Sequence, residues 1–382
     1  MTATLNLPCA NHFALKISGP NTLELFSSTP LPVLEPSDIL VRVICVSINH
    51  VDGKSADLSP SPGATSGSDF SGIVVQTGTG VDTDKFRADK NDMKNLQVGD
   101  RVFGGVFGNN PLRLDNGAFA EYVAVPANLV WRIPAGMDFK TASSLGATLA
   151  TVGLSLFHYL QLPMPTMPSD PTSNMKVQGV KQTVLVYGGG TATGAMAIQV
   201  LKLVDIIPIT VCSSSSASNA LSLGAKATFD YHSPTCGADI REYTSGDLAL
   251  VLDCITDTAS MSICYEALGP KGGRYVALDA FPLRGHTRRS VIPAWVCTPT
   301  QFGHAITWAA PYNLEPRPQD HECAKKWYVV AQKFLDSGLI SPHPLETRRG
   351  GLAAVGGGMD AVRRGEVKGK KLVYPIVEEL CT

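Results

Sequence analysis

The first part of the chain is a series of short apolar or alternating runs broken by Gly, Pro, Asn and Asp. The runs cover residues 15–19, 23–27, 38–49, 70–81, 100–105 and 119–126. Segments of this length and period predict β-strands, and their close spacing predicts a small antiparallel barrel. The charged segment 82–97 interrupts the series and is expected to form a solvated loop.

A different pattern begins near residue 182, where apolar runs alternate with helix-period segments. Strands are expected at 182–187, 206–212, 227–231, 248–255 and 273–279, and helices at 192–204, 218–225, 238–245 and 259–268. This alternation predicts a doubly wound parallel sheet. The Pro- and Ser-rich segment 163–174 lies between the two patterns and indicates a boundary.

The C-terminal part is mixed. An amphipathic helix is expected at 324–338, and a short helix, a turn and a strand at 358–377. This last strand has no obvious place in the parallel sheet, so it could return to the first domain. The predicted fold class is α/β, and the expected domain ranges are 1–165 for the barrel, 166–315 for the parallel sheet and 316–382 for the returning part.

Composition excludes several partner classes. The chain has 32 Lys and Arg against 33 Asp and Glu, so it lacks the basic excess that nucleic acid or an anionic membrane would require. The N-terminus lacks the features of a secretion signal, and nine cysteines without a C-x-x-C pair indicate reduced thiols and a cytoplasmic location. The charge-free stretch 141–169 is long enough to span a bilayer, but its Ser, Thr, Gly and Pro content predicts a buried helix and a loop.

A glycine turn, VLVYGGGTATG at 184–194, separates the first expected strand of the parallel sheet from its helix. Unpaired backbone N–H groups and the helix dipole make such a turn suitable for a pyrophosphate. The spacing departs from G-x-G-x-x-G, because the third position is Thr193 and Gly194 comes one residue late. An ordinary capped turn would have the same composition, but its place on the first strand of a β–α series favours a nucleotide.

The end of the second expected strand bears on the choice of nucleotide. NAD-binding folds usually place an Asp or Glu there for the ribose 2′-hydroxyl, whereas this chain has Cys212 followed by Ser213, Ser214, Ser215 and Ser216. A 2′-phosphate is therefore tolerated, and NADPH is favoured over NADH. Because this stretch has no Lys or Arg, hydroxyls, backbone amides and Tyr231 would have to bind the phosphate.

These segments together resemble the medium-chain dehydrogenase/reductase superfamily. The resemblance rests on VRVICVSINHVDGKS, SGSDFSGIVVQTGTGV, VGDRVFGG, GAFAEYVAVPA, the glycine turn and GEVKGKKLV, which occur in order over nearly the whole chain. More narrowly, YGGGTATG, ATFDY, LDCIT, TWAAPY and HPL resemble fungal trans-acting enoyl reductases of the lovastatin-pathway type, which serve iterative polyketide synthases. The resemblance implies a Rossmann domain, a GroES-like β-barrel domain formed by both chain ends, and NADPH in the cleft between them.

The zinc-dependent branch of this superfamily has a metal ligand and a Gly-His-Glu motif near Cys45 and Ser68. The corresponding stretch here is SGSDFSG, without His or Glu, and a tight four-cysteine cluster for a structural zinc is missing from the sequence. The chain therefore resembles the metal-free reductases, and no metal is expected.

The resemblance also implies a set of binding residues. For NADPH these are His50, Val51, Asp52, Gly53, Gly190, Thr191, Ala192, Thr193, Ser213, Ser214, Ser215, Ser216, Tyr231, Leu278, Asp279, Gly369 and Lys370. For the substrate they are Ser143, Ser144, Leu145, Gly146, Ala147, Thr148, Leu149, Ala150, Thr298, Pro299, Thr300, Gln301 and Phe302.

Two catalytic candidates follow from the same comparison. Lys54 matches a lysine of the lovastatin-pathway type of enoyl reductase, and Thr151 matches an active-site threonine of the same type. Either could serve the chemistry of enoyl reduction, in which hydride reaches the β-carbon of an unsaturated thioester and the enolate is protonated. Other zinc-free enoyl reductases use a tyrosine in the first-domain loop, but HVDGKSADLSP has none, so solvent remains an alternative proton source.

The expected partner is an iterative polyketide synthase, or a polyketide synthase–peptide synthetase hybrid, which would present a polyketide acyl thioester on its acyl carrier domain. Two other functions remain open. The protein could be a stand-alone NADPH-dependent quinone or enone reductase, or it could bind the nucleotide without catalysis. Many superfamily members dimerise, whereas the trans-acting type resembles monomers, so a monomer is expected.

Overall fold

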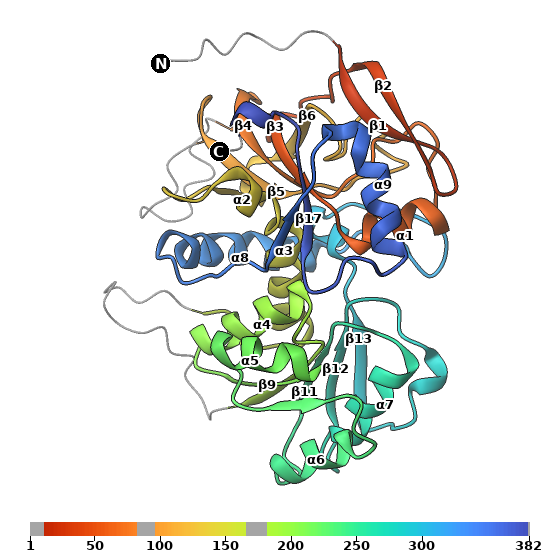
Figure 1. Ribbon diagram of the computed structural model, residues 1–382, viewed down its shortest axis with the longest axis vertical. Helices are drawn as coiled ribbons and strands as arrows, with labels where there is room; N and C mark the ends of the chain where they lie inside the picture. Colours follow the sequence, from red (N-terminus) through yellow and green to blue (C-terminus); the bar gives the residue numbers. More distant parts are fainter. Residues whose placement is uncertain (1–10, 82–95, 166–181, 381–382) are drawn as a thin grey trace.

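A computed structural model describes residues 11–81, 96–165 and 182–380 of the chain. Figure 1 shows two lobes, one above the other, with helices α3 and α8 between them. Most of the expected loop at 82–97 and of the expected boundary at 163–174 lies outside the described residues.

The second lobe is built on a parallel sheet with the strand order β10-β9-β8-β11-β12-β13. Its strands are β8 (Thr183–Tyr187), β9 (Ile207–Cys212), β10 (Thr228–Asp230), β11 (Leu250–Asp253), β12 (Gly273–Ala277) and β13 (Val291–Trp295). The order reverses direction between β8 and β11, which is the topological switch point of a doubly wound sheet. The predicted parallel sheet is confirmed.

Helices cover both faces of this sheet, and this explains why its strands are apolar throughout. The helices are α4 (Ala192–Leu203), α5 (Ser214–Leu223), α6 (Cys236–Tyr243) and α7 (Thr258–Ala267). Along β8, Val184 and Val186 join the core that contains α4, whereas Leu185 joins the core that contains α6 and α7. Successive side chains of a strand point to opposite faces, so both faces require apolar residues.

Both ends of the chain contribute to the first lobe. Its main sheet has the order β16-β17-β3-β4-β5-β7, with β6 paired to β3. The strands are β3 (Asp38–Ser47), β4 (Asp69–Thr77), β5 (Arg101–Gly105), β6 (Tyr122–Pro126), β7 (Val130–Arg132), β16 (Leu345–Thr347) and β17 (Lys371–Pro375), beside a hairpin of β1 (Asn11–Gly19) and β2 (Thr22–Pro30). Because β17 pairs antiparallel with β3, the C-terminal strand does return to the first lobe.

The remaining elements connect the lobes or lie against one of them. The longer helices are α1 (His50–Leu58), α2 (Phe139–Ser143), α3 (Gly146–Gly153), the π-helix η3 (Leu154–Tyr159), α8 (Pro318–Asp336) and α9 (Gly351–Arg363). The short elements are η2 (Ala127–Leu129), η4 (Leu283–Gly285), η5 (Thr298–Phe302), β14 (Ile306–Thr307), β15 (Asn313–Leu314) and η6 (Glu378–Leu380). Across the described ranges, no helix is long and apolar enough to cross a bilayer; the charge-poor stretch from residue 141 contributes to α2, α3 and η3.

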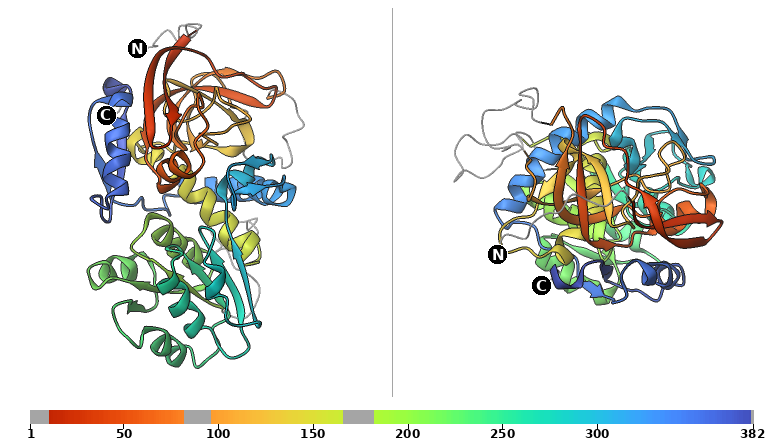
Figure 2. Two further views of the ribbon diagram at one scale, coloured as in Figure 1. Left: turned by 90° about the vertical axis from the view of Figure 1, so that its right-hand side faces the viewer. Right: turned by 90° about the horizontal axis from the view of Figure 1, so that it is seen from above.

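Helix α8 packs against α3 at the junction of the lobes (Figure 2). It begins earlier than the sequence pattern predicted, with Pro318 in its first turn, where a missing N–H costs no helical hydrogen bond. The ring of Tyr328 stacks on Trp131 at 3.8 Å, and the indole of Trp327 donates to the Leu149 carbonyl at 2.7 Å. These contacts anchor α8 to both β7 and α3, and α8 in turn contacts η5.

Candidate functional site

A cavity of about 700 Å³ lies at the switch point of the parallel sheet and extends to the first lobe. The second lobe contributes the loops after β8 and β11 and the end of β12, and the segment from Trp295 to Tyr312, which starts at the end of β13, also lines the cleft. The first lobe contributes α1, α3 and the turn before β17. Ligands of doubly wound folds bind at this position, outside the carboxyl ends of the strands, so this cleft is the candidate active site.

The glycine turn forms the floor of the cleft, and its unusual spacing has a geometric reason. Gly188 has a φ of 92°, in the left-handed region that favours glycine. A Cβ at Gly194 would clash with the Gly188 carbonyl, so Gly194 allows α4 to pass close to the turn. The late glycine therefore supplies the close approach that the third glycine of the standard fingerprint supplies.

Thr191 is the N-cap of α4. Its hydroxyl accepts from the Gly194 N–H at 3.0 Å and donates to the Gly188 carbonyl at 2.8 Å. A Cβ at Gly190 would lie 2.7 Å from the Ser216 hydroxyl, so the turn passes close to the start of α5. The turn leaves backbone close to the cleft at a helix N-terminus, and such a cradle fits a pyrophosphate.

Ser213–Ser216 lie at the N-terminus of α5, outside the residues that line the cleft. The Ser213 hydroxyl is 3.0 Å from that of Ser215 and 3.2 Å from that of Ser216. Tyr231 is exposed just beyond β10. The position of Ser216 beside Gly190 places this hydroxyl-rich surface next to the glycine turn.

A polar cluster joins the two lobes across the cleft. The Lys54 ammonium on α1 forms an ion pair with Asp279, which follows β12. The other carboxylate oxygen of Asp279 accepts from the Tyr312 hydroxyl at 2.6 Å, and the Lys54 Nζ lies 5.3 Å from the centre of the Tyr312 ring. Burial opposes the charge on Lys54, but hydrogen bonds with Asp279 and Tyr312 raise its pKa overall, so the ammonium form persists.

One wall of the cleft is apolar. Phe107, Cys297, Ile306 and Trp308 form a buried cluster. Val51, Trp295, Phe302, Tyr312 and Leu314 pack against it. Several of these side chains also line the cleft, so a hydrocarbon chain could lie there without leaving polar groups unpaired.

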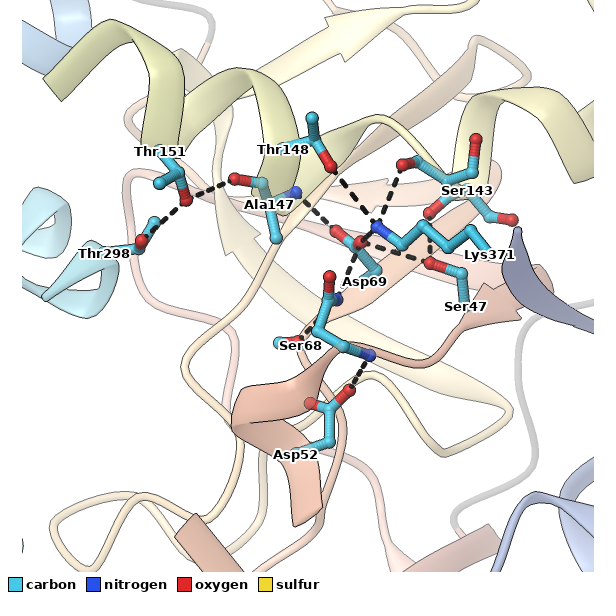
Figure 3. A network of polar contacts seen from close by, with 12 residues as sticks. Ser47, Asp52, Ser68, Asp69, Ser143, Ala147, Thr148, Thr151, Thr298 and Lys371 are labelled. Atoms are coloured by element: carbon cyan, nitrogen blue, oxygen red, sulfur yellow. Dashed lines mark hydrogen bonds and ion pairs between the residues drawn. The ribbon is translucent and has the colours of Figure 1, made fainter. Parts of the chain in front are cut away.

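Helix α3 meets the cleft through hydroxyl groups. The Thr151 hydroxyl is 2.7 Å from the Ala147 carbonyl and 2.8 Å from the hydroxyl of Thr298 on η5 (Figure 3). The neighbouring Gln301 accepts from the buried Tyr328 hydroxyl at 3.0 Å, which orients its amide. These contacts fix η5 against α3 and α8 beside the cleft.

A buried ion pair lies at the start of α3 and joins distant parts of the first lobe (Figure 3). The Lys371 ammonium at the start of β17 donates to Asp69 at 2.6 Å and to the Ser144 carbonyl at 2.9 Å. Asp69 also accepts from the Ala147 N–H at 2.5 Å and from Asn49 and Ser47 at 2.8 and 3.1 Å. The carboxylate therefore holds β3, β4, β17 and α3 in one arrangement.

Asp52 and His50 lie at the start of α1, close to this network. The Asp52 carboxylate accepts from the Asn49 N–H at 2.7 Å and caps α1. Burial raises the pKa of Asp52 to about 7, although the Asn49 hydrogen bond opposes the rise. Burial and the nearby Lys371 charge lower the pKa of His50, which favours a neutral imidazole at the cleft.

The structure brings many of the expected residues together in the cleft. Those that line it are His50, Val51, Lys54, Ala147, Thr148, Thr151, Gly190, Thr191, Ala192, Thr193, Leu278, Asp279, Thr298, Pro299, Gln301, Phe302, Gly369 and Lys370. Among the described residues, those that do not line it are Asp52, Gly53, Ser143, Ser144, Leu145, Gly146, Leu149, Ala150, Ser213, Ser214, Ser215, Ser216, Tyr231 and Thr300. Several of the latter support residues that do, as Ser144 does through Lys371.

Sequence reasoning missed Tyr312, Trp295 and the loop 254–256, all of which line the cleft. TWAAPY, which ends at Tyr312, and LDCIT, which ends with the loop 254–256, contribute to the family resemblance, but the sequence predicts no role for Tyr312 or for this loop. The signal was therefore present, but nothing in the spacing showed that residue 312 would lie opposite residue 54. Trp308 is both buried and cleft-lining.

Where the zinc-dependent branch would have its Gly-His-Glu motif, Ser68 and Asp69 take part in the hydrogen-bond network around Asn49 and Lys371. In the part of the chain that the structure describes, no group of three or more His, Cys, Asp or Glu side chains could hold a metal ion.

Comparisons with known proteins agree with this architecture. Residues 35–135 match the alcohol dehydrogenase GroES-like domain family, and residues 192–308 match the zinc-binding dehydrogenase family. The trans-enoyl reductase iccB of Talaromyces variabilis is 70% identical over 370 residues, which cover 97% of each chain. The chain belongs to the trans-enoyl reductase family. A trans-enoyl reductase, iliB of Neonectria sp., is also 67% identical over 97% of each chain.

Membership of this family makes the chain a nicotinamide-dependent oxidoreductase of the medium-chain superfamily. Solved structures share the fold at lower identity. An alcohol dehydrogenase superfamily protein from Novosphingobium aromaticivorans has a TM-score of 0.72 at 21% identity, covering 95% of this chain and 99% of its own. A quinone oxidoreductase from Pseudomonas syringae has a TM-score of 0.68 at 18% identity, with 95% and 99% covered.

The cap at α4 allows a specific test of the pyrophosphate role. In Thr191→Asp the carboxylate can still cap the helix, so the fold is expected to persist, but its charge would repel a pyrophosphate. NADPH affinity measured by fluorescence titration should fall below detection. Thr191→Asn, an uncharged cap, is the control and should retain most of the affinity; equal affinity of the Asp variant and wild type would remove the phosphate role.

The buried ion pair can be tested by stability. Lys371→Met would leave the Asp69 carboxylate without its cation in the core and should lower the free energy of unfolding by about 3–5 kcal/mol. Lys370→Met, at an exposed neighbouring position, should change it by less than about 0.5 kcal/mol. Urea denaturation followed by circular dichroism measures both, and similar values for the two variants would contradict the importance of the pair.

Proposed function

We propose that this protein reduces the α,β-unsaturated acyl thioester carried by a partner polyketide synthase, with NADPH as reductant, in secondary metabolite biosynthesis. The observation that carries the proposal is the cleft itself, in which a glycine cradle, an apolar wall and the Lys54 ammonium face one another. Full-length relatives named trans-enoyl reductases support it.

The cofactor would be held mainly by the second lobe. The glycine turn and Thr193 suit its pyrophosphate, and Leu278 and Asp279 form the wall beside the expected nicotinamide. When bound, NADPH supplies hydride to the β-carbon of the enoyl group. The chain's residues position the two reactants and exclude water.

The preference for NADPH rests on the surface beside the glycine turn. NAD-binding folds usually carry a carboxylate after the second strand. At this position Ser213–Ser216 instead provide hydroxyl groups at the N-terminus of α5. Asp230 lies nearby at the end of β10, and one of its carboxylate oxygens is 2.7 Å from Nδ1 of His232. The serine hydroxyls and the helix N-terminus are the groups that make a 2′-phosphate acceptable.

Lys54 would stabilise the charge that develops on the thioester oxygen after hydride addition. Its raised pKa keeps it cationic, and one carboxylate, Asp279, anchors it at the cleft. Thr151 and Thr298 provide hydroxyls on the opposite side, where they would orient the acyl group. Donors placed where charge develops lower the barrier more than donors that bind the substrate and transition state equally.

The apolar wall would accommodate the polyketide chain, while the acyl carrier domain of the synthase would dock outside the cleft. The protein would act as a monomer in the cytoplasm. The edge strand β13 contains Pro293, which has no N–H to donate and is typical of edge strands that do not pair further. The described cysteines are all free thiols, as expected in a reducing compartment.

Stopped-flow absorbance with purified protein tests the function. Mixing with NADPH and an enoyl thioester on pantetheine or on an acyl carrier domain should oxidise NADPH in a single turnover and yield the saturated thioester. Rapid reduction of small free enones or quinones, without activity on thioesters, would instead indicate a stand-alone quinone or enone reductase. Bound NADPH without hydride transfer to any of these would indicate a nucleotide-binding protein without catalysis.

Lys54→Ala tests the role of the ammonium. The variant should lower kcat about 10²–10³-fold, the effect of removing one oxyanion donor, with little change in NADPH affinity. Lys326→Ala, an exposed lysine on α8, is the control and should keep the wild-type rate. A wild-type kcat in Lys54→Ala would leave Lys54 as an ordinary surface lysine.

A further inference from the structure

Tyr312 occupies a position in the cleft that the proposed function does not yet use. It precedes β15, far in the sequence from both Lys54 and Asp279, yet its hydroxyl is 2.6 Å from Asp279. Of the tyrosines that the structure describes, Tyr312 is the one that lines the cleft.

The two ends of this side chain face different surroundings. The ring packs on the buried cluster of the apolar wall, and its centre lies 5.6 Å from that of Trp295 in an edge-to-face arrangement. The hydroxyl donates to Asp279, which forms the ion pair with Lys54. This pair lies beside the expected position of the nicotinamide. An enoyl group bound between the expected nicotinamide and the apolar wall would have its double bond where these two surfaces meet. The Tyr312 hydroxyl would then be within reach of that double bond.

The phenol also holds its proton. Burial, followed by the hydrogen bond with Asp279, raises the pKa of Tyr312 above its ordinary value, so the group is protonated at neutral pH. Its hydrogen can leave Asp279 by rotation about the C–O bond, without movement of the ring. Asp279 then keeps its ion pair with Lys54, so no carboxylate is left unpaired.

We propose that Tyr312 is the general acid that protonates the α-carbon in the enoyl reduction. The inference rests on the proposed function. Hydride brings two electrons to the β-carbon, and the π electrons of the double bond move onto the α-carbon and thioester oxygen as an enolate. The Tyr312 O–H bond then breaks as the α-carbon C–H bond forms, and the phenolate, balanced by the Lys54 ammonium, regains a proton from solvent.

With this assignment, a proton donor is present although the loop at 50–60 contains no tyrosine. The phenol comes instead from the segment before β15 and reaches the same cluster as Lys54. Lys54 and Tyr312 thus have separate tasks, because the ammonium stabilises the enolate oxygen and the phenol delivers the proton to carbon.

Tyr312→Phe removes the hydroxyl and keeps the ring packing. With a 2-methyl-2-enoyl pantetheine thioester and NADPH, kcat should fall about 10²–10⁴-fold, the usual contribution of a general acid. NADPH affinity should stay within about threefold of wild type. The residual product should be a mixture of epimers at the α-carbon, since solvent would protonate either face, whereas wild type should give one epimer.

Tyr243→Phe is the matched control, because Tyr243 is exposed on α6 and lies outside the cleft. A Tyr312→Phe variant with wild-type kcat and a single epimer would overturn the proposal. A slowed variant that still gives a single epimer would also overturn it, because loss of a purely structural contact does not change which face of the enolate is protonated. Absence of thioester reduction by wild type would instead overturn the proposed function, which separates the two failures.

Discussion

The buried ion pair between Asp69 and Lys371 is the contact on which the arrangement of the cleft depends. A carboxylate in the core is costly unless cations and donors surround it, and Asp69 obtains them from β17, α3 and β3 together. The C-terminal strand must therefore return to the first lobe, and α3 must begin where its Ala147 N–H meets the carboxylate. This places Thr148 and Thr151 along the cleft.

The second constraint is the glycine turn of the parallel sheet. Its close packing against α4 brings backbone to the cleft at the switch point between β8 and β11. The ion pair and the glycine turn thus both border one cavity, through Lys371 and through residues 190–193. Lys54 and Asp279 connect across it, so this part of the candidate site is complete only when both lobes meet.

The fold was largely predictable, because hydrophobic periodicity reports directly on which faces of an element are buried. The apolar run of β8 indicated a strand covered on both faces, and Val184 and Leu185 do pack into different cores. The start of α8 was harder to predict, since Pro318 opens the helix several residues before its amphipathic pattern begins. The glycine turn was found by composition, and its late glycine became understandable only through the close approach of Gly194 to Gly188.

By itself the sequence determined the α/β class, the glycine turn, the hydroxyls of Ser213–Ser216 and the family resemblance, because all of these depend on residues that are close together along the chain. The tertiary structure decided which distant side chains meet. Tyr312, Asp279 and Lys54 come from three separate segments, and Asp69 meets Lys371 across almost the whole chain. Such encounters depend on how strands pair and lobes pack, and no local pattern of hydrophobic or polar residues encodes them.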